Sequence, residues 1–233
     1  MKKSIFTILT LLFFSVGLFA SAGLIASVEL FTSVELFTQN SAESRKIIDK
    51  TYNDYISSEG IKLSFVLTTI DSDGEEFDSQ KGVASIKANK FHLEMNDMDV
   101  WFDGKTQWVL MKSIDEVNIS NPSESELASI SQLALLGMYK DGYLLKAPAS
   151  KTLNNKGVHL IEMTPIDATK EFKSINIYIE KVSGRLIQAF FTLKNNMQTK
   201  IDITNYNDNY KFNDSDFIFD KSQYKDTEVI DLR

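Results

Sequence analysis

Hydrophobic and polar residues alternate along most of the chain after residue 60. Because successive side chains of a strand point to opposite faces, this alternation is typical of strands with one apolar face. The short turns between the runs from 174 to 206 predict a meander of three neighbouring strands. The alternation predicts strands at 61–68, 82–88, 91–95, 98–102, 105–111, 115–120, 158–163, 174–181, 185–194, 197–206 and 216–220, with a short tail at 228–233.

The run from 98 to 111 holds both tryptophans and the clearest turn signal, Asp103-Gly104. Asp-Gly favours the positive φ angles of a two-residue hairpin turn, which would pair Phe102 with Lys105 and Val100 with Gln107. Both faces of this hairpin are apolar, so a sheet built around it needs cover on each side. One face carries Met98, Val100, Phe102, Val109 and Met111, and the other carries Trp101, Trp108 and Leu110.

Two stretches have helical spacing instead. The first covers 41–55 and ends before Gly60, and its apolar stripe consists of Ile47, Ile48, Tyr52 and Tyr55. The second covers 124–139, where Ser123 and Glu126 form a capping box. Its second half is hydrophobic nearly all round, so we expect it to be buried on more than one side.

These elements predict an α+β fold with about nine to eleven antiparallel strands and two or three helices. A helix of fifteen residues is only about 20 to 25 Å long, so two of them cannot densely fill the concave side of a large sheet. The sheet then either closes on its own side chains or leaves apolar volume for a ligand. An ordinary core without a cavity remains the alternative.

The N-terminus has the pattern of a signal peptide over residues 1–22. Lys2 and Lys3 are followed by an apolar run over 5–19 and by the cleavage pattern Ala20-Ser21-Ala22. Residues 23–40 are expected to be a mobile leader, in which the hexapeptide at 27–32 is repeated at 33–38. Residues 41–233 are expected to form a single domain.

Charge and cysteine content limit the partners and the compartment. Loss of Lys2 and Lys3 with the signal peptide would change the formal net charge from −7 to −9, which disfavours nucleic acid. The chain contains no cysteine, so it forms no disulfide and offers no cysteine for lipid attachment. We therefore expect a protein that is soluble after export.

Signs of catalysis or of a cofactor are weak. The two histidines, His92 and His159, lie within separate strand patterns and do not make a zinc site. Gly104-Lys105-Thr106 lacks the upstream glycine of a phosphate-binding loop, and residues 71–75 do not fit a calcium loop. No nucleophile can be paired with a base, so neither an enzyme nor a cofactor is predicted.

A family resemblance rests on four stretches. They are Gly82-Val83-Ala84-Ser85-Ile86-Lys87, then Asn89-Lys90-Phe91, then the hairpin from Val100 to Trp108, and finally the C-terminal stretch from Tyr224 to Arg233. Together they resemble the periplasmic outer-membrane lipoprotein carrier family, LolA, and the last stretch is similar to carrier-like proteins from Bacteroidetes.

The resemblance implies a strongly curved, incomplete antiparallel β-barrel whose open, concave side is covered by helices. It also implies an acyl-chain cavity, in which Phe91 matches the aromatic residue of the family. With the strand pattern, the predicted cavity residues are Phe65, Leu67, Ile86, Phe91, Leu93, Met95, Val100, Phe102, Val109, Met111, Phe191 and Leu193, and the predicted lid residues are Ile130, Leu133 and Leu136. The arginine that holds the family's lid closed is replaced here by Ala88, with Lys87 before it.

The function that the resemblance implies is transport. A monomeric periplasmic carrier would receive acylated lipoproteins from an inner-membrane lipoprotein-releasing ABC transporter and deliver them to an outer-membrane acceptor. The alternative is a periplasmic regulator that senses lipid or lipoprotein on the same fold.

Overall fold

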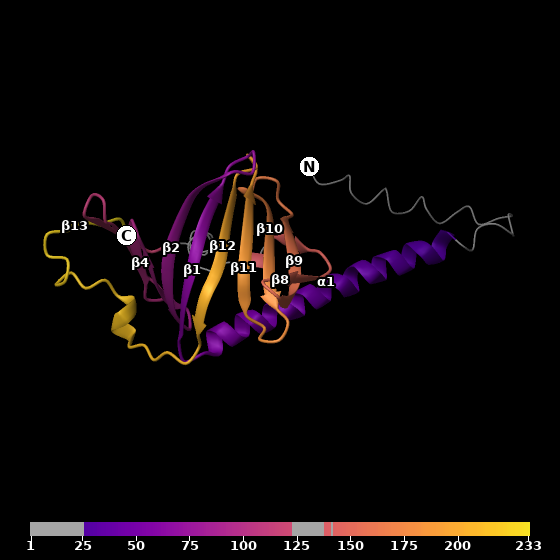
Figure 1. Ribbon diagram of the computed structural model, residues 1–233, viewed down its shortest axis with the longest axis horizontal. Coiled ribbons are helices and arrows are strands. Elements are labelled where there is room, and N and C mark those ends of the chain that lie inside the picture. Colours follow the sequence, from indigo (N-terminus) through magenta and orange to yellow (C-terminus); the bar gives the residue numbers. More distant parts are fainter. Residues whose placement is uncertain (1–25, 123–137, 141) are drawn as a thin grey trace, which may run out of the picture. The chain divides into compact units, whose positions relative to one another are not determined.

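The computed structural model describes residues 26–122, 138–140 and 142–233. Within these residues the chain forms one α-helix, two short 3₁₀ helices and thirteen strands (Figure 1). The helices are α1 (Ala26–Ser57), η1 (Met138–Lys140) and η2 (Asp214–Phe217). The strands are β1 (Ile61–Ile70), β2 (Glu76–Lys87), β3 (Lys90–Met95), β4 (Met98–Phe102), β5 (Gln107–Met111), β6 (Glu116–Ser120), β7 (Tyr143–Leu145), β8 (Ala149–Leu153), β9 (Lys156–Pro165), β10 (Phe172–Glu180), β11 (Leu186–Leu193), β12 (Gln198–Asn207) and β13 (Glu228–Asp231).

The chain divides into two compact units, Met1–Gln39 and Asn40–Arg233. Helix α1 begins at Ala26, so the duplicated hexapeptide at 27–38 is helical, and the helix is longer than the predicted stretch of 41–55. The second unit contains the sheet, and the description below concerns that unit.

All thirteen strands belong to one sheet. Its order is β13-β6-β5-β4-β3-β2-β1-β12-β11-β10-β9-β7, and β8 pairs with β9 beside this path. Two antiparallel meanders, β1–β6 and β9–β12, are joined in the middle by the pairing of β1 with β12, as Figure 1 shows. The predicted meander of three strands is confirmed. The two end strands, β13 and β7, are not paired with each other in the described part of the chain, so the sheet is not closed into a barrel.

Several predicted elements differ from the structure. The strand count exceeds the predicted nine to eleven because β7 and β8 lie in a segment without apolar alternation, and β8 is almost entirely exposed. The predicted helix at 124–139 lies outside the described residues except for its end, which is η1. Covering helices are therefore not observed as predicted, because the described residues contain one α-helix.

The hairpin between β4 and β5 has a longer loop than predicted. Phe102 pairs with Gln107 and Val100 with Val109, so the loop has four residues rather than two. The Asp103 carboxylate accepts hydrogen bonds from the backbone N–H groups of Lys105 and Thr106, at 2.9 and 2.8 Å, and these bonds stabilise the wider loop. Because the register moves by two residues, each side chain keeps its predicted face.

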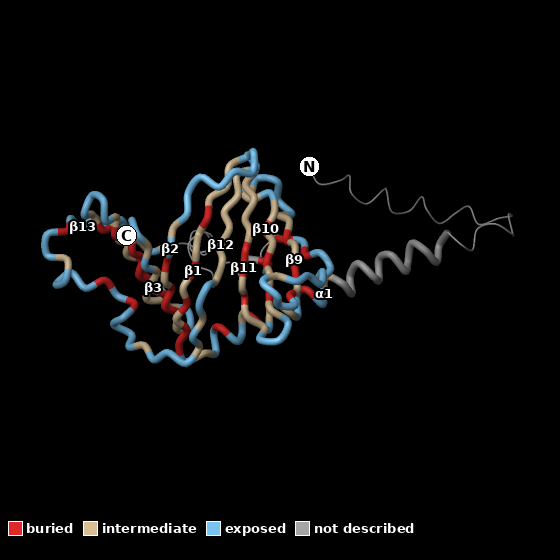
Figure 2. Tube along the Cα trace, in the orientation of Figure 1, coloured by how far each residue is buried: buried red, intermediate tan, exposed pale blue. Residues whose placement is uncertain are grey.

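One face of the sheet, called the inner face here, carries the main hydrophobic core. The core includes Leu63, Ile86, Phe102 and Ile177, together with Ile48 and Tyr55 of α1. A register shift between β10 and β11 places Leu186 in this core, where the sequence pattern predicts Ile187. Buried stretches alternate with half-buried ones along the strands, and most turns between strands are exposed (Figure 2).

Phe65 and Gly82 are cross-strand neighbours in the centre of the inner face. The Phe65 ring lies so close to Gly82 that a Cβ atom added at Gly82 would be 2.2 Å from Phe65 Cζ. The tip of the Phe65 ring, Cζ with Cε1 and Cε2, therefore takes the space that a side chain at position 82 would need, which favours glycine there.

The opposite, outer face of β4–β6 carries a second core, formed by Trp101, Leu110, Val117 and Phe219. The need for cover on both sides of the predicted hairpin is thus confirmed. The cover comes from the C-terminal segment: Phe219 and Tyr224 pack against Trp101, with ring centroids 5.4 and 5.9 Å away.

The C-terminal segment itself was predicted incorrectly. Residues 216–220 do not form a strand, because the Asp216 carboxylate accepts a hydrogen bond from Asn213 N–H at 2.8 Å and the chain turns there as η2. The predicted tail instead contains β13, which pairs in parallel with β6. Thr227 Oγ1 donates to Asp115 Oδ1 at 2.6 Å beside this pairing.

Substitution of Gly82 by alanine should destabilise the protein by about 1 to 3 kcal/mol, because the new Cβ displaces Phe65 from a packed core. Gly157→Ala is the matched control, since the nearest atom to its added Cβ is Lys181 Cδ at 3.7 Å. Urea denaturation should show a lower free energy of unfolding for Gly82→Ala alone. Equal effects of the two changes would contradict the packing argument.

A second prediction concerns His92, whose ring stacks on Trp101 at 4.7 Å. Burial lowers the pKa of His92, Glu94 and Asp99 raise it, and Lys62 and Lys112 lower it further. Since the folded-state pKa is lower than the unfolded value of about 6.5, the neutral ring stabilises the fold above that pH, and this contribution is lost as the pH falls below it.

Denaturation series at pH 7 and below should therefore show a decline in stability that is smaller in His92→Phe, which keeps a ring on Trp101. His159→Gln serves as a comparison, because His159 also has a pKa lowered by burial but lies in β9. An unchanged decline in His92→Phe would show that His92 does not contribute.

Candidate functional site

Ten of the twelve residues predicted to line a cavity are in the main core of the inner face or pack against it. The other two are cross-strand partners of residues that pack against it. Phe65, Ile86, Phe91, Val100 and Phe102 are buried in the main core. Leu67, Leu93, Met95, Val109 and Phe191 are half-buried and pack against that core. The remaining two, Met111 and Leu193, are half-buried and pair with Met98 and Phe172, which also pack against it. The three predicted lid residues, Ile130, Leu133 and Leu136, lie outside the described residues.

The strand register arranges this face of β1–β5 in three rows. The first row consists of Ile61, Ile86, Phe91, Phe102 and Gln107. The middle row consists of Leu63, Ala84, Leu93, Val100 and Val109. The third, called the methionine row here, consists of Phe65 on Gly82 followed by Met95, Met98 and Met111.

Burial decreases from the first row to the methionine row. Every residue of the first row is buried, whereas Leu93 and Val109 of the middle row and all three methionines are half-buried. In the methionine row the buried residues are Phe65 and Gly82, on β1 and β2. The other half of the sheet has the same trend in β11, where Leu186 and Ala189 are buried and Phe191 is half-buried. The partly accessible part of the inner face is therefore one end of it.

Helix α1 contributes to the buried end through contacts with β12 and with the segments next to β7 and β11. Ile48 and Tyr55 of this helix are in the main core, and Tyr55 packs on Tyr206 of β12 at 5.8 Å. Burial raises the pKa of Tyr55 well above its usual value and that of Tyr206 to about 12, so both phenols stay neutral. Two buried hydroxyls fix the helix, since Ser44 donates to Lys146 O at 2.5 Å and Thr51 to Gly184 O at 2.9 Å.

The chain also contacts α1 at η1, directly after the stretch that is not described. The Tyr139 hydroxyl donates to the Asp49 carboxylate, and the Arg45 guanidinium lies 5.4 Å from the Tyr139 ring centroid. Lys140 lies over Tyr52 at 4.3 Å. These contacts attach residues 139–140 to the helix, and sequence reasoning missed them because they join segments about ninety residues apart.

Lys87 binds the C-terminal segment. Its ammonium group donates to Phe212 O at 3.0 Å and to Asp214 Oδ1 at 3.1 Å, and Lys90 forms an ion pair with the same carboxylate at 3.0 Å. These lysines lower the pKa of Asp214. Ala88 is an exposed turn residue with a φ angle of 53°. The two lysines thus bind the C-terminal segment.

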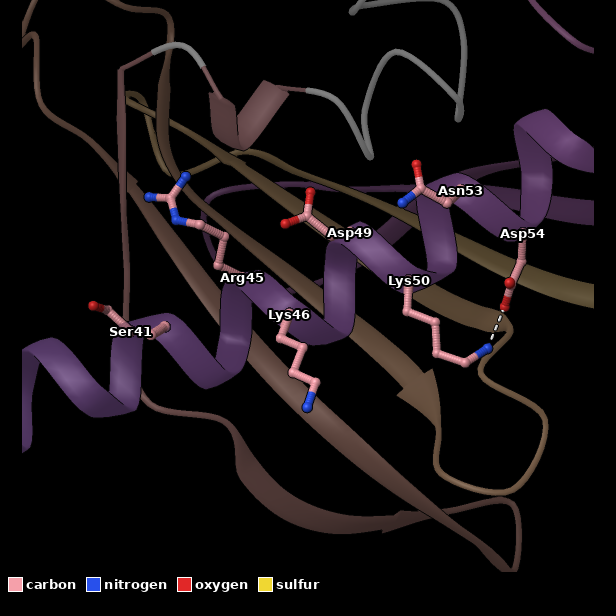
Figure 3. Close-up of a pocket in the computed structure, with 8 residues that line it drawn as sticks. Ser41, Arg45, Lys46, Asp49, Lys50, Asn53 and Asp54 are labelled. Carbon is pink, nitrogen blue, oxygen red and sulfur yellow. Dashed lines mark hydrogen bonds and ion pairs between the residues drawn. The ribbon is translucent and has the colours of Figure 1, made fainter.

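A hollow of about 580 Å³ lies along α1 and is shown in Figure 3. Its described lining residues all come from α1 and include three cationic and two acidic side chains, with Lys50 paired to Asp54 at 2.5 Å. None of the twelve predicted cavity residues lines it. The hollow is lined mainly by charged and polar side chains of α1 and by no residue of the apolar rows.

Sequence reasoning also omitted inner-face residues from the candidate site. Met98 was placed on the correct face but left out of the cavity, and Ile201 and Ile203 of β12 were recognised only as a strand face. Alternation alone would have added all three, since each is half-buried against the main core.

In the described ranges, no three histidine or acidic side chains form a metal-binding group. Nor does any helix in those ranges have the length and apolar character needed to cross a membrane.

The burial trend predicts different roles for the two ends of the face. Phe91→Ala should cost about 3 to 5 kcal/mol, because Phe91 is buried against Phe102 at 5.4 Å. Met111→Ala should cost less than about 2 kcal/mol, because its side chain is half-buried and less packing is lost. Urea denaturation of both variants measures this, and similar losses would contradict a trend in packing along the strands.

Comparisons with known proteins identify a family for this chain. The family described as outer membrane lipoprotein carrier protein LolA matches residues 34–183. None of the curated proteins matches the chain.

Solved structures share the fold at low sequence identity. A conserved protein from Thermus thermophilus superposes with a TM-score of 0.57 at 11% identity, covering 81% of this chain and 99% of its own. A LolA superfamily protein from Nitrosomonas europaea gives 0.43 at 13% identity, with 75% and 97% covered. A lipoprotein-sorting protein domain from Vibrio parahaemolyticus gives 0.42 at 10%, with 76% and 97% covered. The first similarity supports the fold, and the latter two scores are too low to carry an argument.

The family match includes α1 from Val34, the whole of β1–β10 and the first half of the inner face with its three rows. Since it spans more than half of the sequence, this chain belongs to the outer membrane lipoprotein carrier protein LolA family.

Proposed function

We propose that the protein binds the acyl chains of lipoproteins on the half-buried end of the inner face and carries lipoproteins from the inner to the outer membrane. The observation that carries the proposal is the trend in burial across the three rows. A face used only as core would be expected to be buried along its whole length, whereas this one is buried at one end and partly accessible at the other.

The chemistry of the rows supports a hydrocarbon ligand. Apart from Gln107 in the buried first row, the fifteen positions of the three rows carry only apolar residues, and none carries a charge. An anionic or cationic group would lose its hydration there without a partner. Each methylene group removed from water contributes about 0.8 kcal/mol, so one long acyl chain supplies ample binding energy.

The family membership supports a carrier rather than an enzyme, and the wider setting is part of the proposal. Residues 1–22 would direct export and be removed, and the mature protein would act as a monomer in the periplasm. Its partners would be acylated lipoproteins, an inner-membrane ABC transporter that releases them and an outer-membrane acceptor. The acyl chain must also leave, so the half-buried end serves both entry and release.

Two adjacent residues of β1 provide the test. Leu67 is half-buried against the main core, and Val66 is similarly exposed on the outer face. Leu67→Glu should reduce the release of a lipoprotein from inner-membrane vesicles by roughly tenfold or more, because a carboxylate would have to be desolvated by the acyl chain. Val66→Glu should leave release near the wild-type level.

Equal behaviour of the two variants would show that the inner face does not hold the ligand. Lipid extraction and mass spectrometry of the protein purified from its native periplasm provide an independent measurement. Bound lipoprotein that the protein cannot pass to an outer-membrane acceptor would favour the sensing alternative over transport.

A further inference from the structure

Three of the chain's seven methionines lie together at the accessible end of the inner face. Met98 and Met111 are direct cross-strand partners, and Met95 is separated from Met98 only by the short turn between β3 and β4. All three are half-buried, and Met95 pairs with Gly82, on which the Phe65 ring lies. By contrast, Met163 of β9 is fully buried.

The backbone beneath these methionines is fixed by Lys112. Its N–H donates to Asp97 O at 2.9 Å and its ammonium group donates to Met95 O at 2.7 Å. The same ammonium group pairs with the buried Asp99 carboxylate at 2.8 Å. The turn and the ends of three strands are thereby held together from the outer face.

Methionine differs from the leucine, valine and phenylalanine of the other two rows in a useful way. Its side chain is unbranched, has three rotatable bonds and ends in a polarisable thioether, so it adapts to ligands of different shape. The same thioether can be oxidised to a sulfoxide, which is polar and no longer suits an apolar contact. An accessible methionine surface is therefore both adaptable and sensitive to oxidants.

We propose that Met95, Met98 and Met111 are the ligand-contacting surface that lets this site accept acyl chains of different shape, and that peroxide oxidation of their thioethers reversibly prevents acyl binding. The inference rests on the proposed function, because it assigns part of the acyl site.

Oxidation of each methionine consumes one molecule of hydrogen peroxide. The thioether sulfur attacks one peroxide oxygen, the O–O bond breaks and an S–O bond forms. Sulfur loses two electrons, hydrogen peroxide gains them, and after proton transfer the remaining oxygen leaves as water. Methionine sulfoxide reductases reverse the change.

The test uses the mature chain and synthetic diacylated lipopeptides with short, long and methyl-branched chains as probes. Treatment with hydrogen peroxide should weaken lipopeptide binding by the wild type by roughly tenfold or more, because three polar sulfoxides replace apolar contacts. Subsequent reduction by methionine sulfoxide reductases should restore binding. Mass spectrometry identifies which methionines carry oxygen.

Variants distinguish oxidation of the three methionines from oxidation elsewhere in the protein. The triple variant M95L/M98L/M111L should retain its affinity after peroxide treatment and should discriminate more strongly than the wild type between straight and branched chains. Met197→Leu is the matched control, because Met197 is also half-buried but lies outside the row, and it should remain as sensitive as the wild type. The variant M95Q/M98Q/M111Q should reproduce the loss of binding without oxidant, while circular dichroism reports on its fold.

The inference is overturned if sulfoxide at the three positions leaves binding unchanged, or if the triple leucine variant is as sensitive to peroxide as the wild type. It is also overturned if the triple leucine variant discriminates between chains no better than the wild type. Failure of the untreated wild type to bind any lipopeptide is a different result, since it refutes the proposed function and the inference with it.

Discussion

Side-chain alternation in the strands is the constraint on which the rest of the structure depends. A sheet has two faces, and in β4–β5 both are apolar, so each face needs its own cover. The described residues supply two covers of different extent. Helix α1 covers one end of the inner face, while the C-terminal segment covers the outer face of β4–β6. Neither cover fully buries the other end of the inner face, which is half-buried. The proposed acyl site lies at that end.

A few ion pairs at the ends of β2–β5 hold these strands in place. Lys87 and Lys90 bind Asp214 at one end of β2–β3, and Lys112 binds Asp99 and the turn before β4 at the other. All these contacts lie outside the inner face and hold the strands that carry the three rows. The strands that carry the accessible end are therefore stabilised by contacts that do not involve the inner face. This arrangement suits a site whose ligand must both bind and leave.

The strands with strong alternation were predictable from sequence because the information is local. Residues 61–67, 91–95 and 174–206 form the expected strands, and the family resemblance places them in the correct fold. The missed features depend on particular distant or competing contacts. The Asp103 carboxylate widened the hairpin loop, hydrogen bonding between Asn213 and Asp216 replaced a strand by η2, and β13 pairs with a strand more than a hundred residues earlier. The predicted site residues share the inner face because alternation fixes the face of a strand residue, but the sequence pattern did not reveal how burial varies along that face.

The parallel pairing of β13 with β6 has a consequence for how this protein folds. Glu228 and Glu116 are neighbours in the sheet but far apart along the chain, as are Phe219 and Trp101. Contacts of such large sequence separation form late, since a long loop must close before they contribute. The tryptophan side of β4–β6 therefore stays uncovered in a partly folded chain until the C-terminal segment docks. During that interval an apolar surface and an unpaired strand edge are exposed together, a combination that favours association with other chains. A newly made copy should then depend on folding helpers most strongly just before its last strand is in place.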